Sequence, residues 1–319
     1  LSNIDLNSLS DKEKVTYGML EFALDSNYDS LVDRGWEFSA GVAGFEGFLI
    51  DYNQQMFIPD KESGDMLLKR LELYEKFYSQ ISDVQKRGLE NNRVATQRNL
   101  KRSIDQLESY LKTSPDSDPL LLVNFAPTVD KKEISEWKEK AKKVVEKYVR
   151  PNVLSYLEQL QVEHLPKGRT DENPGIMWIE GGEEVYLRSL RKYTGHKETT
   201  VKEVHEIGLS EIERLKKEFF EIGKGVFDGV NSPEEVLYKM QTEPSMRYES
   251  KEQMLQLAED TIERAYKPLS EWFTVFPKAP CKVLPVPTQS EKPAPPAYYF
   301  PPLPDGSRDG TYFLNTYKA

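Results

Sequence analysis

Residues 200–222 read TVKEVHEIGLSEIERLKKEFFEI, the clearest helical pattern in the chain. The apolar positions recur every three or four residues, at Val204, Gly208, Ile212, Leu215, Phe219 and Ile222. This spacing lines one face of a helix. Thr200 and Glu203 stand in the order of a capping box, which predicts that Thr200 caps the start of the helix.

Similar patterns extend outward on both sides, so the chain from about residue 10 to residue 276 is predicted to be helical. Three more start signals pair an N-cap residue with a partner three positions later: Ser232 with Glu235, Ser250 with Gln253, and Asp130 with Glu133. The longest helix is predicted from Asp65 to about Arg93. Breaks are expected at residues 114–119 and 166–182, whereas Pro151 can sit in a first helical turn. The predicted fold class is mainly α, with a multi-helix body.

The composition changes at Pro277, where the helical body is predicted to end. Ten of the 20 prolines lie between Pro277 and Pro304, and this density excludes helix. The segment is predicted to be an extended connector over the helical body. A polyproline ligand for an SH3-like or WW-like domain is the alternative. The chain therefore divides into a helical body, residues 1–276, and a second region, residues 277–319.

The end of the chain predicts a small β-hairpin. Residues 297–319 read AYYFPPLPDGSRDGTYFLNTYKA, two aromatic runs around a segment with two Asp-Gly turns. Side chains alternate between the two faces of a strand, so one face of each strand is expected to pack inward and the other to line a groove. The first predicted group is Tyr298, Phe300, Tyr312 and Leu314, and the second is Tyr299, Phe313 and Asn315. Because a hairpin alone is marginal in water, it should pack on another surface.

The charge balance argues against two classes of partner. The formal net charge is -10, whereas nucleic acid and anionic membranes select basic surfaces. No apolar run approaches the roughly 20 residues that span a bilayer. The single cysteine, Cys281, excludes an internal disulfide and is expected to be a small, half-buried hydrophobe.

The residues by themselves offer no complete catalytic constellation. His205-Glu206 opens like a zinc-peptidase motif, but Leu209 stands where the second histidine would be needed. His164 is expected at a helix end, where an imidazolium can meet free carbonyls, and His196 is expected in a loop. No two histidines are therefore predicted to reach metal-ligand spacing.

Two segments resemble the domain-of-unknown-function family eight-eight-five. The first, from Gly181 to Phe219, contains GGEEVYLRSLRKYTG and VKEVHEIGLSEIERL, and the second contains PAYYFPP and DGSRDGTYFLNT. The resemblance covers roughly residues 60–319. It implies a mainly α-helical zinc metallopeptidase of the carboxypeptidase-like kind, secreted or of lipoprotein type. In that family a His-Glu-x-x-x-His-His-type metal helix follows shortly after the second segment.

The resemblance also implies which residues meet a peptide substrate: Tyr298, Tyr299, Arg308, Tyr312 and Asn315 would line or support the groove. Arg308 could hold a peptide carboxylate by a bidentate pair, and a turn arginine that faces solvent is the alternative. Asp309 stands where the family often has proline, which changes the turn and adds a negative charge near Arg308. No catalytic or metal-binding residue is assigned to this chain.

Because the metal helix would start beyond Ala319, we expect the amino-terminal portion of a zinc-dependent peptidase, inactive by itself. Zinc is the cofactor expected in a full-length relative and not in this chain. The alternative is an acidic secreted or extracellular-matrix binding protein without catalysis. We expect a secreted or extracellular location, with a cytoplasmic one as the alternative. The uncovered aromatic hairpin predicts self-association, which removal of residues 297–319 would relieve.

Overall fold

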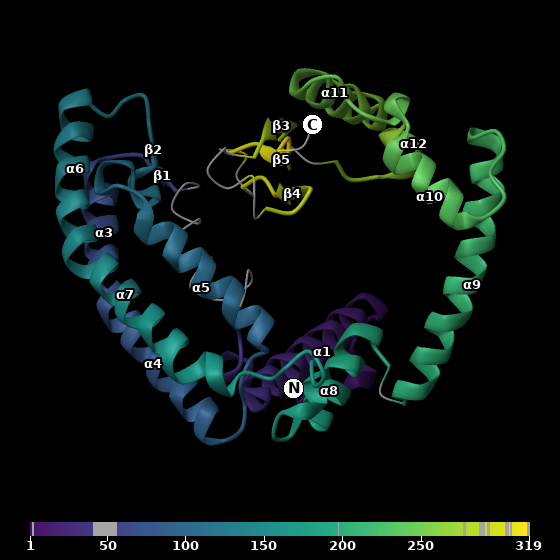
Figure 1. The fold of residues 1–319 in the computed structure, drawn as a ribbon, viewed down its shortest axis with the longest axis horizontal. Helices are drawn as coiled ribbons and strands as arrows, with labels where there is room; N and C mark the ends of the chain where they lie inside the picture. Colours follow the sequence, from purple (N-terminus) through teal and green to yellow (C-terminus); the bar gives the residue numbers. More distant parts are fainter. Residues whose placement is uncertain are drawn as a thin grey trace. The chain divides into compact units, whose positions relative to one another are not determined.

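The computed structural model describes residues 1, 3–40, 56–196, 198–276, 279–286, 291, 294–303, 306 and 308–317. Within them the chain forms two compact units, Leu1–Val201 and Lys202–Ala319 (Figure 1). Helices dominate both units, which confirms the predicted mainly α fold class.

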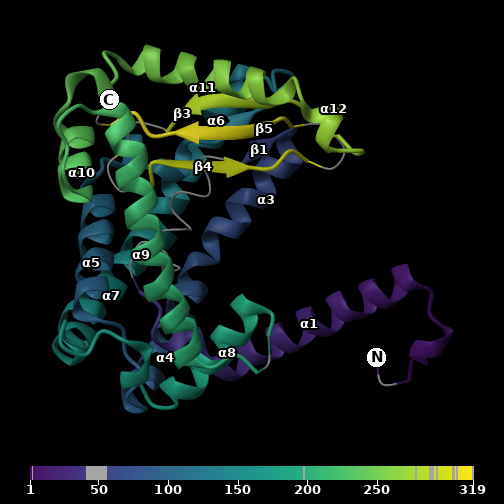
Figure 2. The same cartoon turned by 90° about the vertical axis from the view of Figure 1, so that its right-hand side faces the viewer.

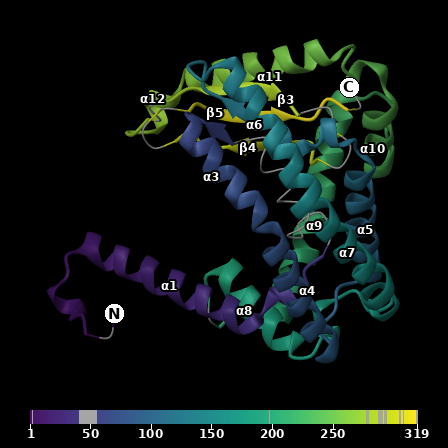
Figure 3. The same ribbon diagram turned by 90° about the vertical axis from the view of Figure 1, so that its left-hand side faces the viewer.

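The first unit is a layered helical body. Its helices are α1 (Asp11–Asp33), α3 (Lys61–Glu72), α4 (Tyr74–Glu90), α5 (Gln97–Lys112), α6 (Lys131–Val144), α7 (Arg150–Gln159) and α8 (Gly182–Thr194). α3 lies beside α6, and α4 and α5 both pack on α7 (Figure 1). α1 runs past α8, to which the Arg188–Asp33 ion pair joins it (Figure 3). Two short strands, β1 (Phe57–Ile58) and β2 (Asn124–Phe125), pair in parallel.

The helix predicted from Asp65 to Arg93 is divided in two at Leu73. The N–H of Leu73 bonds to the carbonyls of Arg70 and Leu71, and a new helix starts at Tyr74. The tight turn at this point brings both Leu71 and Tyr74 into the core. The longest helix among the described residues is instead α9 (Val201–Val226), in the second unit.

α6 and α7 are joined by a wider helical turn at Val145–Val149, and a second such turn, Leu160–His164, follows α7. Pro151 lies in the first turn of α7, as predicted. A proline has no N–H to give to the preceding turn, and a wider turn accommodates its ring without ending the helix. The helical path therefore continues from Lys131 to His164.

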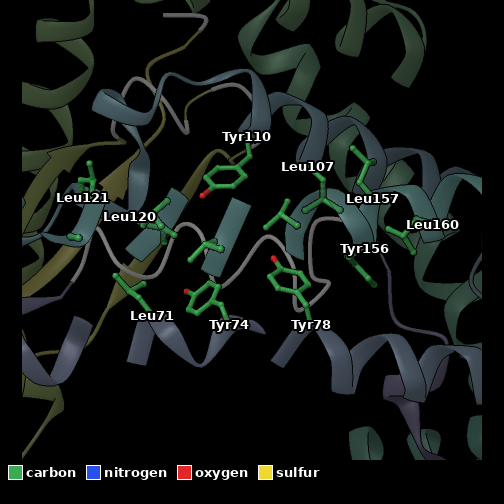
Figure 4. Close-up of a cluster of buried hydrophobic side chains, with 14 of the residues drawn as sticks. Leu71, Tyr74, Tyr78, Leu107, Tyr110, Leu120, Leu121, Tyr156, Leu157 and Leu160 are labelled. Carbon is green, nitrogen blue, oxygen red and sulfur yellow. The ribbon is translucent and has the colours of Figure 1, made fainter. Parts of the chain in front are cut away.

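The core of the first unit is apolar and continuous. It is drawn from α3 to α7 and the two wider turns, and Leu71, Leu107 and Leu160 are fully buried in it (Figure 4). Val149 and Val153 are fully buried as well. Tyr78 lies 5.5 Å from Tyr156, measured between ring centres, which joins α4 to α7. A core of this extent supports an independently folded domain.

Arg93 joins four segments at one end of this core. Its Nε lies 2.8 Å from Oε2 of Glu37, and both side chains are buried. Its guanidinium also donates to the carbonyls of Asp33 and Glu180, at the end of α1 and just before α8. Gly88 makes room here, because a Cβ at that position would stand 2.4 Å from the carbonyl O of Glu37.

A second buried polar cluster closes the carboxyl end of α5. Nη1 of Arg150 lies 2.9 Å from Oδ2 of the fully buried Asp118, and its Nη2 donates to the carbonyls of Leu111 and Thr113. Tyr110 donates its hydroxyl to the same carboxylate at 3.0 Å. Burial, together with Asp118, raises the pKa of Tyr110 above its usual range. The tyrosine therefore stays a neutral donor.

The second unit contains helices α9, α10 (Pro233–Thr242), α11 (Lys251–Tyr266) and α12 (Leu269–Trp272), and strands β3 (Cys281–Pro285), β4 (Ala297–Phe300) and β5 (Gly310–Leu314). The predicted caps at Ser232 and Ser250 are confirmed, since each hydroxyl accepts from a backbone N–H three residues later. In the first unit the predicted cap at Asp130 is also confirmed. The β strands form one mixed sheet in the order β3-β5-β4, with α11 beside β3 (Figure 2).

We expect Gly182→Ala to destabilise the first unit by on the order of 3 kcal/mol. A Cβ at Gly182 would stand 1.9 Å from the carbonyl O of Ile176, and backbone atoms cannot rotate away. Gly18→Ala is the matched control, because a Cβ there meets nothing within 4 Å and α1 should gain stability. Urea unfolding of both variants checks this, and equal stability would mean that the loop at Ile176 yields freely.

We expect the stability of the first unit to fall as pH drops below about 6.5, the usual pKa of histidine. His164 is buried, contrary to the imidazolium expected at a helix end, and burial lowers its pKa. The unfolded chain then takes up a proton that the folded chain refuses, so folding loses free energy in acid. Hydrogen exchange of the α7 amides at pH 7.5 and pH 5 measures this effect. The loss of protection on acidification should be smaller in His164→Gln than in the wild type, whereas His205→Gln, at an exposed position, should match the wild type.

Candidate functional site

The predicted hairpin belongs to a larger sheet, because the proline-rich segment contains a strand. β4 pairs antiparallel with β5, as predicted, and β3 pairs in parallel on the other side of β5. Figure 2 shows β5 between its neighbours, with β4 running the opposite way. The sequence does not predict β3, because a parallel partner follows a long connection and leaves no turn signal.

The register sorts the aromatic side chains differently from the predicted alternation. Tyr298 lies opposite Phe313, and Tyr299 lies opposite Tyr312. Directly opposed residues share one face of an antiparallel pair. Phe313 therefore joins Tyr298 and Phe300, and the predicted grouping of Tyr312 with Tyr298 is wrong. Alternation fixes the faces within one strand, and only the register relates two strands.

One face of the sheet carries an aromatic cluster. The ring of Tyr298 stacks on that of Phe313, with ring centres 5.0 Å apart and planes at 21°. Phe300 stands edge-on to both rings, at 5.4 Å from Tyr298 and 5.6 Å from Phe313. All three side chains are half-buried. Tyr298 is therefore held in place by its neighbours.

The opposite face carries Tyr299 and Tyr312. Tyr299 is 50% exposed, and its ring covers Gly310, where a Cβ would stand 2.4 Å from the phenol oxygen. Partial burial, then the neighbouring Cys281 and Tyr266, raise the pKa of Tyr299. Tyr312 is half-buried. The two tyrosines thus lie on the face away from Tyr298, so the five predicted groove residues do not share one surface.

β4 forms one edge of the sheet. The N–H of Asn315 donates to the carbonyl of Pro296 at 2.8 Å. Bonding alternates along an antiparallel pair, so the N–H and C=O groups of Ala297 and Tyr299 point away from β5. In the part of the chain that the structure describes, no strand pairs with this edge. An extended peptide can add to such an edge as a further strand.

Arg308 is exposed near the start of β5. Its Nη2 donates to the carbonyl of Pro301 at 3.2 Å, just past the end of β4. Asp309 pairs with Lys282 of β3 at 2.5 Å, so its charge is matched by a partner other than Arg308. Asp305, in the predicted turn, lies outside the described residues. The guanidinium of Arg308 is thus placed beyond one end of the β4 edge.

Asn315 anchors the sheet, and its amide is fully used. Its Nδ2 donates to the carbonyls of Glu291 at 2.7 Å and Ala294 at 3.1 Å, with Pro295 at 3.4 Å. The side chain of Glu291 is buried and accepts from Thr316 and from Lys251, the first residue of α11, both at 3.3 Å. This network ties the end of β5 to the loop before β4 and to α11.

A hollow of about 610 Å³ lies between α11 and β3, the strand at the edge of the sheet opposite β4. Its lining includes Ile262, Tyr266, Cys281 and Val283. Cys281 is half-buried, as predicted, and burial raises the pKa of its thiol. A thiol held protonated is a weak nucleophile. Cys281 therefore packs here as a small apolar residue.

The histidines lie apart. His164 is buried in the first unit, whereas His205 is exposed on α9, four residues before Leu209. Across the residues that the structure describes, no group of three His, Cys, Asp or Glu side chains could hold a metal ion.

We expect Asn315→Asp to destabilise the second unit by about 2 kcal/mol. The change is nearly isosteric, but it removes both amide donors and sets a carboxylate against three carbonyl oxygens. Exposed Asn7→Asp is the control for an added charge and should change stability little. Hydrogen exchange of the β5 amides measures the effect, and unchanged exchange would show that the anchor is dispensable.

Comparisons with known proteins agree with this architecture. The crystal structure described as the "putative lipoprotein from Colwellia psychrerythraea" superposes with a TM-score of 0.77 at 22% sequence identity. The match covers 88% of this chain and 49% of that chain, so this chain spans about half the length of the Colwellia protein. At this identity the likeness shows the fold alone. No curated protein matches the chain.

Within the described ranges, no helix combines the length and apolar character needed to cross a membrane. The family model for bacterial proteins of unknown function, DUF885, matches residues 1–319. The resemblance of the GGEEVYLRSL and AYYFPP segments pointed to the same family. A match over this length shows membership, and the chain belongs to the DUF885 family of bacterial proteins of unknown function.

Proposed function

We propose that this chain is the amino-terminal part of a zinc-dependent, carboxypeptidase-like peptidase, and that the β4 edge of its sheet binds an extended peptide substrate. The observation that carries the proposal is the outward-facing backbone of Ala297 and Tyr299 at the edge of an aromatic-lined sheet. A peptide that adds to such an edge gains affinity from main-chain hydrogen bonds and selectivity from the side chains on the two faces.

The side chains around this edge suit a peptide. The cluster of Tyr298, Phe300 and Phe313 on one face and Tyr299 on the other offer apolar surface for alternate substrate side chains. Arg308 is exposed beyond the end of β4. It is proposed to pair with a terminal carboxylate through two parallel N–H groups. That pairing would favour a substrate that ends near the site, as carboxypeptidase chemistry requires.

The proposal assigns no metal-binding or catalytic residue to this chain, and so no step of hydrolysis. Zinc, where bound in a longer relative, polarises a carbonyl and activates water. Tyr298, Tyr299, Tyr312 and Asn315 are proposed to line or support the groove, and Asn315 does so by holding the sheet against Glu291. By itself the 319-residue chain is proposed to bind and not to cleave.

A secreted or extracellular location goes with this proposal, and it is supported by the description of the Colwellia protein as a lipoprotein. The alternative is an acidic extracellular binding protein without catalysis. The net charge of -10 gives its acidic character, and the open sheet edge would serve binding with or without hydrolysis.

The expectation that removing residues 297–319 improves solubility depended on an isolated hairpin. β5 is instead the central strand of the sheet and carries the Asn315 anchor. Removing it would leave β3 without its partner, and an unpaired strand is itself an association liability. Self-association of the intact chain through the β4 edge stays a proposal.

We expect Ala297→Pro to raise the dissociation constant for a peptide about fivefold to tenfold. This corresponds to the binding free energy of about one backbone hydrogen bond. Proline removes an N–H that points outward, so the sheet itself should tolerate it. The probe is a pool of synthetic hexapeptides with free carboxyl termini, observed by saturation-transfer NMR on the 319-residue chain. The matched control, Ala297→Ser, keeps the N–H and should bind as the wild type does.

Two results would count against this function. Equal binding by Ala297→Pro and Ala297→Ser would remove the β4 edge from the site. Zinc-dependent cleavage of the same peptides by the 319-residue chain would show that it holds a metal centre of its own. Binding without cleavage in a full-length relative loaded with zinc would favour the non-catalytic alternative.

A further inference from the structure

The second unit has a much smaller core than the first. Among its described residues, the buried apolar ones are Phe227, Val230 and Val236, where α9 meets α10, with Ala279 and Val286 near the sheet. Phe219 and Phe220 of α9 pack against the first three. A unit of this length ordinarily buries a continuous core. Part of its apolar surface is therefore available for another contact.

Part of that surface lies along α9, where the apolar residues follow one helical face. The residues that share its apolar face, here the α9 stripe, are Val201, Val204, Gly208, Ile212, Leu215, Phe219, Ile222 and Val226. Ile212 is 50% exposed, Leu215 51% and Ile222 62%, and only Gly223 of the whole helix is buried. A helix gains most of its stability by packing such a face. The α9 stripe lacks that packing along most of its length.

One end of α9 shows how close its packing can be. A Cβ at Gly223 would stand 2.4 Å from a methyl group of Val236, so α10 sits directly on the helix there. In the carboxyl half of the helix, a shallow open hollow of about 540 Å³ is instead bordered only by side chains of α9 itself, the apolar Ile212, Leu215, Phe219 and Ile222 with Lys216 and Glu218. Ridges of side chains from a second helix fit into grooves of this kind.

The charges beside the stripe are matched within the helix itself. Arg214 pairs with Glu211 and Glu218, each at 2.8 Å, and Lys216 pairs with Glu213 at 3.3 Å. Such pairs leave little net charge to attract a nucleic acid or a charged ligand. Recognition at the α9 stripe is therefore apolar, and the partner it fits is an amphipathic helix.

From these observations we propose that the α9 stripe is the docking face for helices in the other half of the longer DUF885 fold. The Colwellia protein contains the fold of this chain in 49% of its length, so about as many residues again lie outside the match. Those residues are the occupant to which the proposal commits. The inference does not depend on peptidase activity, since a longer relative that only binds peptides would need the same contact.

The test uses a chimera of the Colwellia protein. In it, the 319-residue chain replaces the half that it matches, and the unmatched half is kept. Amides of residues 204–222 should exchange at least tenfold more slowly in this chimera than in the 319-residue chain alone. Leu215→Glu should abolish that protection. Lys217→Glu, an exposed charge change on another face of the same helix, should leave it intact.

Three outcomes would overturn the proposal. Protection of α9 in the chain alone, with a monomer by sedimentation, would mean that the chain covers its own stripe. The same protection with a dimer would make a second copy the occupant. Equal exchange in a folded chimera would leave the stripe open in the longer protein. The Colwellia crystal structure gives an independent measure, because the positions aligned with Ile212, Leu215 and Ile222 should be buried there by its unmatched half.

Discussion

Carbonyl oxygens left unpaired where helices and loops end are the constraint that this fold has to meet. The last turn of a helix has no internal donors for its carbonyls, and burying them unpaired costs free energy. Long side chains with several donors pair with them here. Arg93 serves the end of α1, Arg150 the end of α5, and Arg169 the loop that contains Asn173 and Gly175. Asn315 does the same for the loop before β4. The junctions between elements are therefore set by single residues.

The arrangement of the sheet also depends on pairing backbone N–H and C=O groups, here between strands. β5 is bonded on both sides, which removes its edges, and the two remaining edges differ. The edge at β3 lies beside α11, whereas β4 keeps backbone groups that point outward. An open edge is an association liability unless a ligand or partner uses it. The candidate site is therefore the β4 edge, because it is the edge with outward-pointing backbone groups. Aromatic rings lie on both faces of this strand.

The two units differ in how far each completes its own packing. The first has a continuous core, and its helices turn at Leu73 and at Val145–Val149 to keep their apolar residues inside it. The second is held by a small cluster at Val236 and by the Glu291 network, with the face of α9 left open. An exposed apolar face of this kind marks an interaction surface, and the occupant proposed for it is the other half of the longer fold.

The sequence by itself determined the elements that depend on neighbouring residues. Local spacing predicted four features that the structure confirms: the mainly helical class, the helix starts at Ser232 and Ser250, the tolerance of Pro151, and the pairing of β4 with β5. Tertiary structure alone decided the parallel partner of β5, the face on which each tyrosine lies, the break at Leu73 and the role of Asn315 as an anchor. These features depend on contacts between residues far apart in the chain. Periodicity within one segment carries no information about the register of another, because register is fixed by packing and by the pairing of buried backbone groups.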